Sequence, residues 1–227
     1  MLLVDLDSQA CASLWLGVSR NQLRPSVASV LLEKYPILKA IRQTAVQNLD
    51  VLPGSLDLAN ADVALSSTRG REIALARMLE RAKPHYDLIV LDCPPGMSLL
   101  AVNALLAADA LLIPVSPEPL AAGALEGLLA AIQRVRTRML SKSRLLGVVL
   151  TEVDPARKPT REIIDRLRAD DRQCVLHTEI RWTAALSEAP AARKPVVTLA
   201  PKSAAADAFR RLAGEVLQRL PPHRNAI

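Results

Sequence analysis

The chain begins Met1-Leu2-Leu3-Val4-Asp5-Leu6-Asp7, an apolar run that ends in two carboxylates. A run of Leu and Val without a polar break is typical of a strand covered on both faces, as in parallel α/β sheets. Ligands of such sheets bind beyond the carboxyl ends of the strands. We therefore expect Asp5 and Asp7 to face a ligand.

Further apolar runs of strand length recur along the 227 residues, at positions 49–52, 88–91, 110–115 and 145–150. Segments of helical period separate most of them. One such segment carries the apolar stripe Leu125, Leu128, Leu129, Ile132 and Val135. This alternation predicts βαβ units, and hence an α/β fold with a mostly parallel sheet flanked by helices. The length of the chain predicts a single domain over residues 1–227.

A second clear helix lies near the end of the chain. Ser203 is a plausible N-cap, apolar residues follow at three- and four-residue steps, and Pro221-Pro222 should stop the helix. The run from 99 to 115 contains Asn103 and Asp109 and is shorter than the ~20 residues of a membrane span. It is better divided into a helix and a strand, so we expect no membrane partner.

The three cysteines, Cys11, Cys93 and Cys174, match no metal-binding or redox spacing. They predict a reduced cytoplasmic protein with buried thiols. No charged leader with an apolar core precedes the first strand, which favours the same compartment.

The formal charge of +6 and the pI near 9.6 favour a polyanionic partner. Aromatic residues make up only 2% of the chain, so few side chains are available to stack on the bases of a single strand. Duplex DNA bound through its backbone fits better.

A second strand also ends in a carboxylate. The stretch from Tyr86 reads Y-D-L-I-V-L-D-C-P-P-G, so that Asp92 follows an apolar run and precedes a rigid turn. Such an Asp can hold Mg²⁺ directly or through water. A capping role would explain one strand of this kind, but two strands with the same ending make it a weaker explanation.

Several motifs occur in order along the chain. They are V-D-L-D-S-Q at 4–9, D-x-x-x-x-D-C-P-P at 87–95, N-A-L at 103–105, A-D-x-x-L-I-P-V at 108–115, T-x-x-D-P at 151–155, S-E-A-P at 187–190 and K-P-V at 194–196. The series resembles the ParA/Soj branch of the ParA/MinD ATPases up to about Leu220. The resemblance implies a P-loop NTPase fold that uses ATP and Mg²⁺, dimerises around ATP, binds duplex DNA nonspecifically and is stimulated by a ParB-like centromere-binding partner. A nucleoid-associated protein of plasmid or chromosome partition is expected.

The same resemblance assigns roles to individual residues. Asp5 and Asp92 would support Mg²⁺ through water, and Asp7 would orient the attacking water. Asp154 and Thr151 would lie near the adenine, with Pro190 flanking the pocket. An Asp-Pro turn that only caps a loop is nearly as good an explanation of Asp154. Residues 180–183 read I-R-W-T where the family usually has I-P-R-N. This departure implies that the contacts to the nucleobase differ from those of the family.

The resemblance also implies a strand and a K-G-G-x-G-K-[ST] loop before Met1, a unit of roughly 30 residues. The loop's amides and lysine grip phosphates, so the 227 residues are expected to bind ATP poorly. We expect that an internal codon was taken as the start and that the natural protein begins upstream. Gene decay, or a short isoform without hydrolysis, is the rival explanation.

Basic residues form three runs, at 134–144, at 157–161 and at Arg210-Arg211. Each alone is typical of a solvated helix face, but together they favour DNA binding. Two other functions stay open. One is an interaction protein that binds DNA or a ParB-like partner without using nucleotide, and the other is a MinD-like membrane-cycling ATPase.

Overall fold

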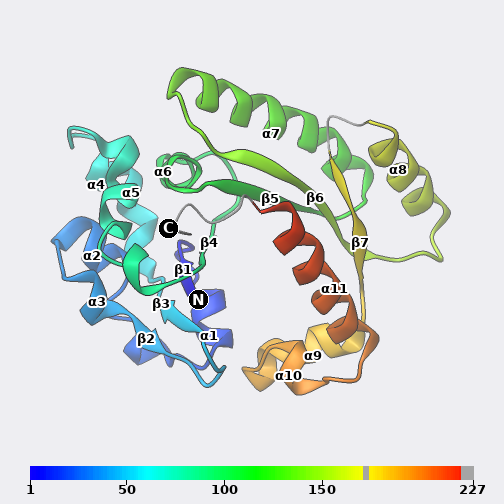
Figure 1. The fold of residues 1–227 in the computed structure, drawn as a ribbon, viewed down its shortest axis with the longest axis horizontal. Coiled ribbons are helices and arrows are strands. Elements are labelled where there is room, and N and C mark those ends of the chain that lie inside the picture. Colours follow the sequence, from blue (N-terminus) through cyan, green and yellow to red (C-terminus); the bar gives the residue numbers. More distant parts are fainter. Residues whose placement is uncertain (171–173, 221–227) are drawn as a thin grey trace. The chain divides into compact units, whose positions relative to one another are not determined.

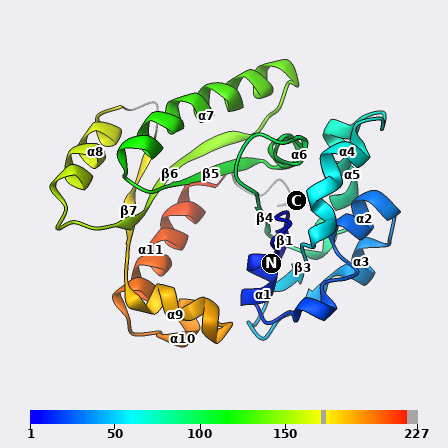
Figure 2. The same ribbon diagram turned by 180° about the vertical axis from the view of Figure 1, so that it is seen from behind.

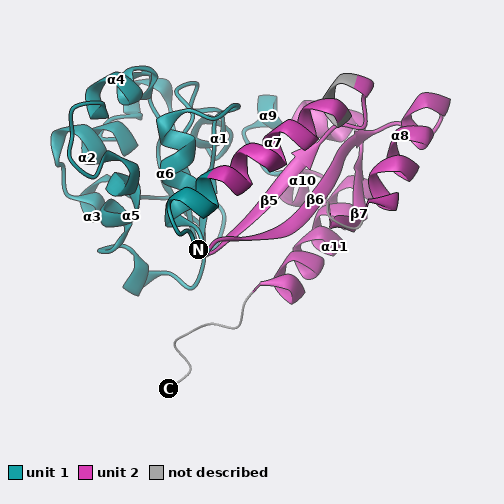
Figure 3. Ribbon diagram, turned by 90° about the horizontal axis from the view of Figure 1, so that it is seen from above, with its two compact units in different colours: residues 1–108, 135–142, 190–195 teal, residues 109–134, 143–189, 196–227 magenta. Residues whose placement is uncertain are grey.

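The fold is given by a computed structural model, which describes residues 1–170 and 174–220. The chain folds into two compact units (Figure 3). Unit 1 contains residues 1–108, 135–142 and 190–195, and unit 2 contains residues 109–134, 143–189 and the chain from residue 196 onward. The single domain expected over residues 1–227 stays a prediction.

Unit 1 is built on a four-stranded sheet with the strand order β2-β3-β1-β4. Its strands are β1 (Leu2–Asp5), β2 (Arg42–Gln43), β3 (Asp50–Leu52) and β4 (Ile89–Asp92). β1 is parallel to β3 and to β4, whereas β2 is an antiparallel edge strand. The apolar run that opens the sequence is therefore the buried centre of this sheet.

Short helices surround the sheet of unit 1 (Figure 1). The α-helices are α1 (Cys11–Trp15), α2 (Val27–Glu33), α3 (Ile37–Ala40), α4 (Ala61–Leu65), α5 (Ala74–Leu79) and α6 (Leu99–Ala107). The 3-10 helices are η1 (Arg20–Gln22), η2 (Leu56–Asn60), η3 (Arg71–Ile73) and η4 (Lys83–His85). One core joins α2, α3, α4, α5, α6 and η2 to the sheet, with Leu2, Val4, Val27, Leu75 and Leu100 among its buried residues.

Unit 2 is a three-layered arrangement around a parallel sheet of β5 (Ala110–Val115), β6 (Arg144–Val153) and β7 (Val175–Arg181), in that order. Its helices are α7 (Pro119–Arg138), α8 (Lys158–Ala169), α9 (Ala184–Ala192), α10 (Val196–Leu199) and α11 (Ala204–Arg219), of which α7 and α9 end in residues grouped with unit 1. Successive residues of β6 point to opposite faces, as a strand requires. Val148 and Leu150 therefore share a core with α7 and α8, and Val149 shares another with α11. Figure 2 shows α7 and α11 on opposite sides of this sheet.

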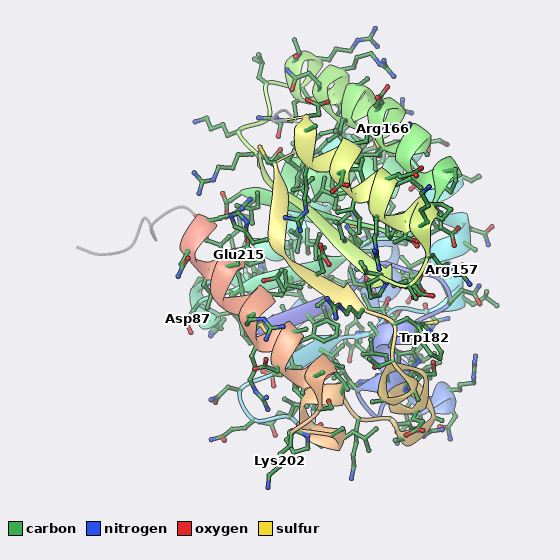
Figure 4. The ribbon with its side chains drawn as sticks, turned by 90° about the vertical axis from the view of Figure 1, so that its right-hand side faces the viewer. Asp87, Arg157, Arg166, Trp182, Lys202 and Glu215 are labelled. Atoms are coloured by element: carbon green, nitrogen blue, oxygen red, sulfur yellow. The ribbon has the colours of Figure 1, made fainter. Side chains whose placement is uncertain are left out.

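Glu215 of α11 fastens this helix to β7. Its two carboxylate oxygens accept hydrogen bonds from the amides of His177 and Thr178, at 2.8 and 3.0 Å, and it pairs with Arg219 at 2.9 Å. Burial alone would raise the pKa of Glu215, but the two amides and the charge of Arg219 outweigh it and lower the pKa. In Figure 4 the labelled Glu215 lies on α11.

The predicted fold class is confirmed, since both units have largely parallel sheets flanked by helices. The run 110–115 is β5, and residues 99–115 do divide into α6 and β5. The last helix begins after Ser203, whose hydroxyl accepts the amide of Ala206, but Pro221-Pro222 lie outside the described residues. Two strands went unpredicted, because β2 has two residues and β7 mixes polar residues such as His177 and Glu179 with Leu176 and Ile180.

The prediction of buried thiols is wrong. Cys11, Cys93 and Cys174 are all exposed. They stand where elements begin or end, at the start of α1, just after β4 and just before β7, rather than within apolar runs. Among the helices described, none has the length and apolar character that crossing a membrane requires.

Candidate functional site

The two predicted acidic strand ends meet in unit 1. β1 and β4 are parallel neighbours, and their register places Asp5 directly opposite Asp92. The amide of Leu6 donates to the carbonyl of Asp92 at 2.9 Å, which continues the pairing past the end of β1. Asp7 follows one residue later. Three carboxylates from two strands therefore gather at one edge of the sheet.

Asp5 is fully buried, and its carboxylate is held by protein donors. One oxygen, Oδ2, accepts hydrogen bonds from the amide and the hydroxyl of Ser13, at 2.9 and 2.6 Å. The other, Oδ1, accepts the amide of Asp7 at 3.1 Å. A buried charge needs such partners, and hydrogen bonds to a charged acceptor are among the stronger ones. Asp5 thus fixes both the start of α1 and the backbone that carries Asp7.

Gly54, just after β3, packs against the same backbone. Its amide donates to the Ser13 hydroxyl at 3.1 Å. A Cβ at this position would lie 2.5 Å from the carbonyl oxygen of Asp7 and 2.9 Å from Oδ1 of Asp5, so a larger residue does not fit without movement. Sequence reasoning missed Ser13 and Gly54. The turn-like Pro53-Gly54-Ser55 after an apolar run was the available signal.

The ionised form of Asp92 is electrostatically unfavourable in this site. The residue as a whole stays exposed, yet partial loss of hydration and then the charges of Asp5 and Asp7 raise the pKa of its carboxyl to about 6. Asp7 is half-buried, and its Oδ1 accepts the amide of Gln9 at 2.9 Å. Carboxylates that repel one another in this way are stabilised by a cation between them or beside them.

Mg²⁺ suits this donor set if water completes its coordination. The ion prefers oxygen ligands, takes few protein carboxylates and keeps several waters. Within residues 1–170 and 174–220, no three His, Cys, Asp or Glu side chains are arranged to hold a metal ion directly. Asp92 is the most exposed residue of the three, whereas both oxygens of Asp5 are already engaged. The arrangement therefore fits a hydrated Mg²⁺ better than a bare one.

The residues expected near a nucleobase are distributed over both units. Thr151 is half-buried in β6, and Asp154 follows that strand in unit 2. Asp154 accepts the amide of Ala156 at 3.0 Å and pairs with Arg157 at 3.3 Å, as a turn-capping residue does. Pro190 lies inside α9 and is grouped with unit 1.

Trp182 lies at the carboxyl end of β7, beside the end of β6. Its amide donates to the carbonyl of Val153 at 3.3 Å, and 63% of its surface is exposed. Figure 4 shows the labelled Trp182 where β7 ends. The departure I-R-W-T thus places a large apolar side chain at the carboxyl edge of the sheet of unit 2.

Most of the basic residues proposed for DNA contact lie on or beside helices, whereas Lys142 lies in the loop before β6 and Arg144 begins β6. Arg210 and Arg211 are exposed on α11, and Arg211 pairs with Asp207. Arg157, from the run 157–161, precedes α8 and is 71% exposed along its side chain, and Arg166, which was not among the predicted residues, lies within α8 (Figure 4). These charges are available to an anion.

Comparison with known proteins adds a family match. A family model described as an AAA domain matches residues 1–145. The sporulation initiation inhibitor protein Soj of Bacillus subtilis is 36% identical over 216 residues, which are 95% of this chain and 85% of that protein. The chromosome partitioning protein ParA of Caulobacter vibrioides is 35% identical over 221 residues, or 96% of this chain and 83% of that protein.

A solved structure agrees in fold. Cobyrinic acid a,c-diamide synthase from Mycobacterium smegmatis, determined with bound ADP and magnesium, superposes with a TM-score of 0.81 at 30% identity. The match covers 96% of this chain and 81% of the synthase.

Proposed function

Because this chain belongs to the ParA/MinD-type family of partition ATPases, we propose that it takes part in DNA partition as a Mg²⁺-dependent ATPase. One observation carries the proposal: the parallel ends of β1 and β4 bring Asp5 and Asp92 opposite each other, with Asp7 beside them. Carboxylates at the carboxyl edge of a parallel sheet are placed where α/β folds bind ligands.

In this proposal each carboxylate has its own task. Asp7 orients a water molecule for attack on the terminal phosphorus of ATP, whose bond to the ADP oxygen breaks to give ADP and phosphate. Asp92 accepts hydrogen bonds from the water shell of Mg²⁺. Asp5 keeps the backbone of Asp7 in place through its Oδ1. When bound, Mg²⁺ neutralises charge on the phosphates, so the protein's part is largely positioning.

The nucleobase side of the proposal rests on unit 2 and on α9. Thr151 and Asp154 at the end of β6 approach the base, and Pro190 flanks it. Asp154 already accepts an amide and pairs with Arg157, which leaves it little free capacity. Base contact through Asp154 therefore requires that the pair with Arg157 opens or is shared.

The partners proposed follow the family. We infer nonspecific binding to duplex DNA, a homodimer in the ATP form, stimulation by a ParB-like centromere-binding protein and association with the nucleoid. The charge of +6 and the exposed arginines of α8 and α11 support the DNA contact, because phosphate neutralisation dominates affinity for duplex DNA.

A second candidate function is an interaction protein that binds DNA or its protein partner without turnover. It is favoured by one observation: the exposed arginines of α8 and α11 could contact an anionic partner without nucleotide. The two functions differ in whether this chain hydrolyses ATP.

Hydrolysis of ATP with and without Mg²⁺ separates them. The first function predicts Mg²⁺-dependent release of phosphate that falls about 100-fold or more in Asp7→Ala and in Asp92→Asn. Asp87→Asn is the matched control, since Asp87 is exposed just before β4 and its loss leaves the site intact. DNA retention without any Mg²⁺-dependent hydrolysis would support the second function instead.

A further inference from the structure

The loop that follows Asp92 is short and open to solvent. Five residues, 93–97, join Asp92 at the end of β4 to Ser98, the N-cap of α6. Pro95, Gly96 and Met97 are exposed, and Gly96 has a φ of +90°. A loop this short takes its course from its two fixed ends. The position of the Asp92 carboxylate therefore depends on where α6 begins.

The beginning of α6 is held by a side chain from another helix. Asp62 of α4 accepts the amide of Leu99 through Oδ2 at 3.1 Å and the amide of Leu100 through Oδ1 at 3.3 Å. Ser98 accepts the amide of Ala101 at 3.2 Å. Three of the four amides that a helix start leaves without partners are thereby satisfied, two of them by Asp62. A carboxylate here also complements the positive end of the helix.

A second contact fixes the body of α6. Asn103 is fully buried, and its Oδ1 accepts the amide of Leu75 at 3.0 Å. Its Nδ2 donates to the carbonyls of Arg71 and Leu99, at 2.8 and 2.9 Å. Asn103 ties α6 to η3 and α5, so α6 cannot move freely as a body. Asp62 then determines the remaining freedom, which is fraying of its first turn.

We propose that Asp62 is a positioning residue for Asp92: by binding the first two amides of α6 it fixes the loop 93–97 and with it the Asp92 carboxylate. The role goes beyond that of a local cap, because Ser98 already provides one within the same segment. Asp62 itself is exposed, whereas its neighbour Ala61 is buried, so its side chain is not needed to fill the core. Its consequence for catalysis rests on the proposed ATPase function, but its effect on the loop does not.

The structural part is tested with Asp62→Ala in the whole chain. Loss of a helix cap of about 1 kcal/mol corresponds to roughly a fivefold change in an opening equilibrium. We expect hydrogen exchange at the Leu99 and Leu100 amides to accelerate by at least that factor. Alkylation of Cys93, whose thiol faces the carbonyl of Leu91 at 3.7 Å, should accelerate in parallel. Peptide mass spectrometry reads Cys93 against Cys11 and Cys174, which should not change.

Two further variants make the result specific. Ser203→Ala removes an equivalent cap from α11, where the hydroxyl accepts the amide of Ala206 at 3.1 Å, and should leave Cys93 unaffected. Asp62→Asn keeps one oxygen acceptor and should give intermediate rates. Unchanged alkylation of Cys93 in Asp62→Ala, despite faster exchange at Leu99 and Leu100, would overturn the positioning role.

The catalytic consequence is read separately. Asp62→Ala should raise the Mg²⁺ concentration needed for half-maximal hydrolysis several-fold, while Ser203→Ala leaves it unchanged. An unchanged Mg²⁺ requirement, with Cys93 more reactive, would show that loop position does not matter for Mg²⁺ and would overturn the link to Asp92. A wild-type chain without hydrolysis contradicts the proposed function, and the exchange and alkylation results still decide the role of Asp62.

Discussion

When the carboxyl group of Asp92 is ionised, it destabilises the folded state. The pKa of its carboxyl is about 6 in the folded chain, against an ordinary value of 3.8, so the folded state holds the proton more tightly than the unfolded state. The free energy of unfolding therefore falls as the pH rises from about 4 to about 6, and it stays at the lower level above that. Such an electrostatic cost at neutral pH is expected for a functional site that binds a cation.

Asp92→Asn should accordingly stabilise the chain without Mg²⁺. Because the residue is exposed and solvent screens its charge, we expect a gain of only about 0.5 kcal/mol at pH 7.5, disappearing below about pH 4. Urea denaturation at several pH values measures it. Asp87→Asn, which removes the same charge from an exposed residue before β4, is the matched control. A less stable Asp92→Asn at pH 7.5 would contradict the repulsion from Asp5 and Asp7.

Sequence alone could predict residues whose role follows from their own segment. Asp5, Asp7 and Asp92 each end an apolar run, so their gathering follows from the parallel pairing of the runs. The residues that support them could not be predicted in this way. Gly54 meets Ser13 across 41 positions and Asp62 meets Leu99 across 37, and these contacts exist only after the chain has folded.

The turn after β3 sets the position of Asp7 by steric fit. Gly54→Ala brings a methyl group to 2.5 Å from the carbonyl of Asp7, so the backbone of one of the two segments must shift. Overpacking of this kind costs about 1–3 kcal/mol. We expect thermal unfolding at a lower temperature and, under the proposed function, weaker hydrolysis.

Gly214→Ala is the control for this substitution. Gly214 lies inside α11, and a Cβ there has no heavy atom within 4 Å. Alanine in a helix interior is favoured over glycine by roughly 0.5–1 kcal/mol, so this variant should be more stable than the wild type. Equal effects of the two substitutions would show that steric contact with Asp7 is not what makes Gly54 necessary.

Helices and strands could be predicted from the sequence where the apolar pattern of the segment is typical of one type of secondary structure. β5 is a continuous apolar run of strand length, and α11 has apolar residues at helical steps after its N-cap Ser203. β7 has only Leu176 and Ile180 buried, since α11 supplies Glu215 to its amides and its other residues, apart from the partly buried Val175, are polar. Its place in the sheet comes from tertiary contacts, which no local pattern shows.

At the scale of the molecule, no signal in the sequence marks the division into two compact units. No linker rich in Gly or Ser separates them, and their residues alternate along the chain, with 135–142 and 190–195 grouped with unit 1. Such a division depends on how distant segments pack together. Net charge, in contrast, is a property of the whole sequence and needs no fold to be counted.

The charge of +6 yields a prediction about DNA that can be localised. Each phosphate contact contributes about −0.9 to the slope of log K against log salt concentration on B-DNA. Arg210 is exposed and forms no ion pair within the described part of the chain, whereas Arg211 pairs with Asp207. Arg210→Ala should therefore reduce the slope by about 1, and Arg211→Ala by less, as measured by fluorescence anisotropy of a labelled duplex with ATP present. Lys39→Ala removes the same charge from the exposed surface of α3 in unit 1. If it changed the slope as much as Arg210→Ala does, total charge rather than a contact at α11 would explain the binding.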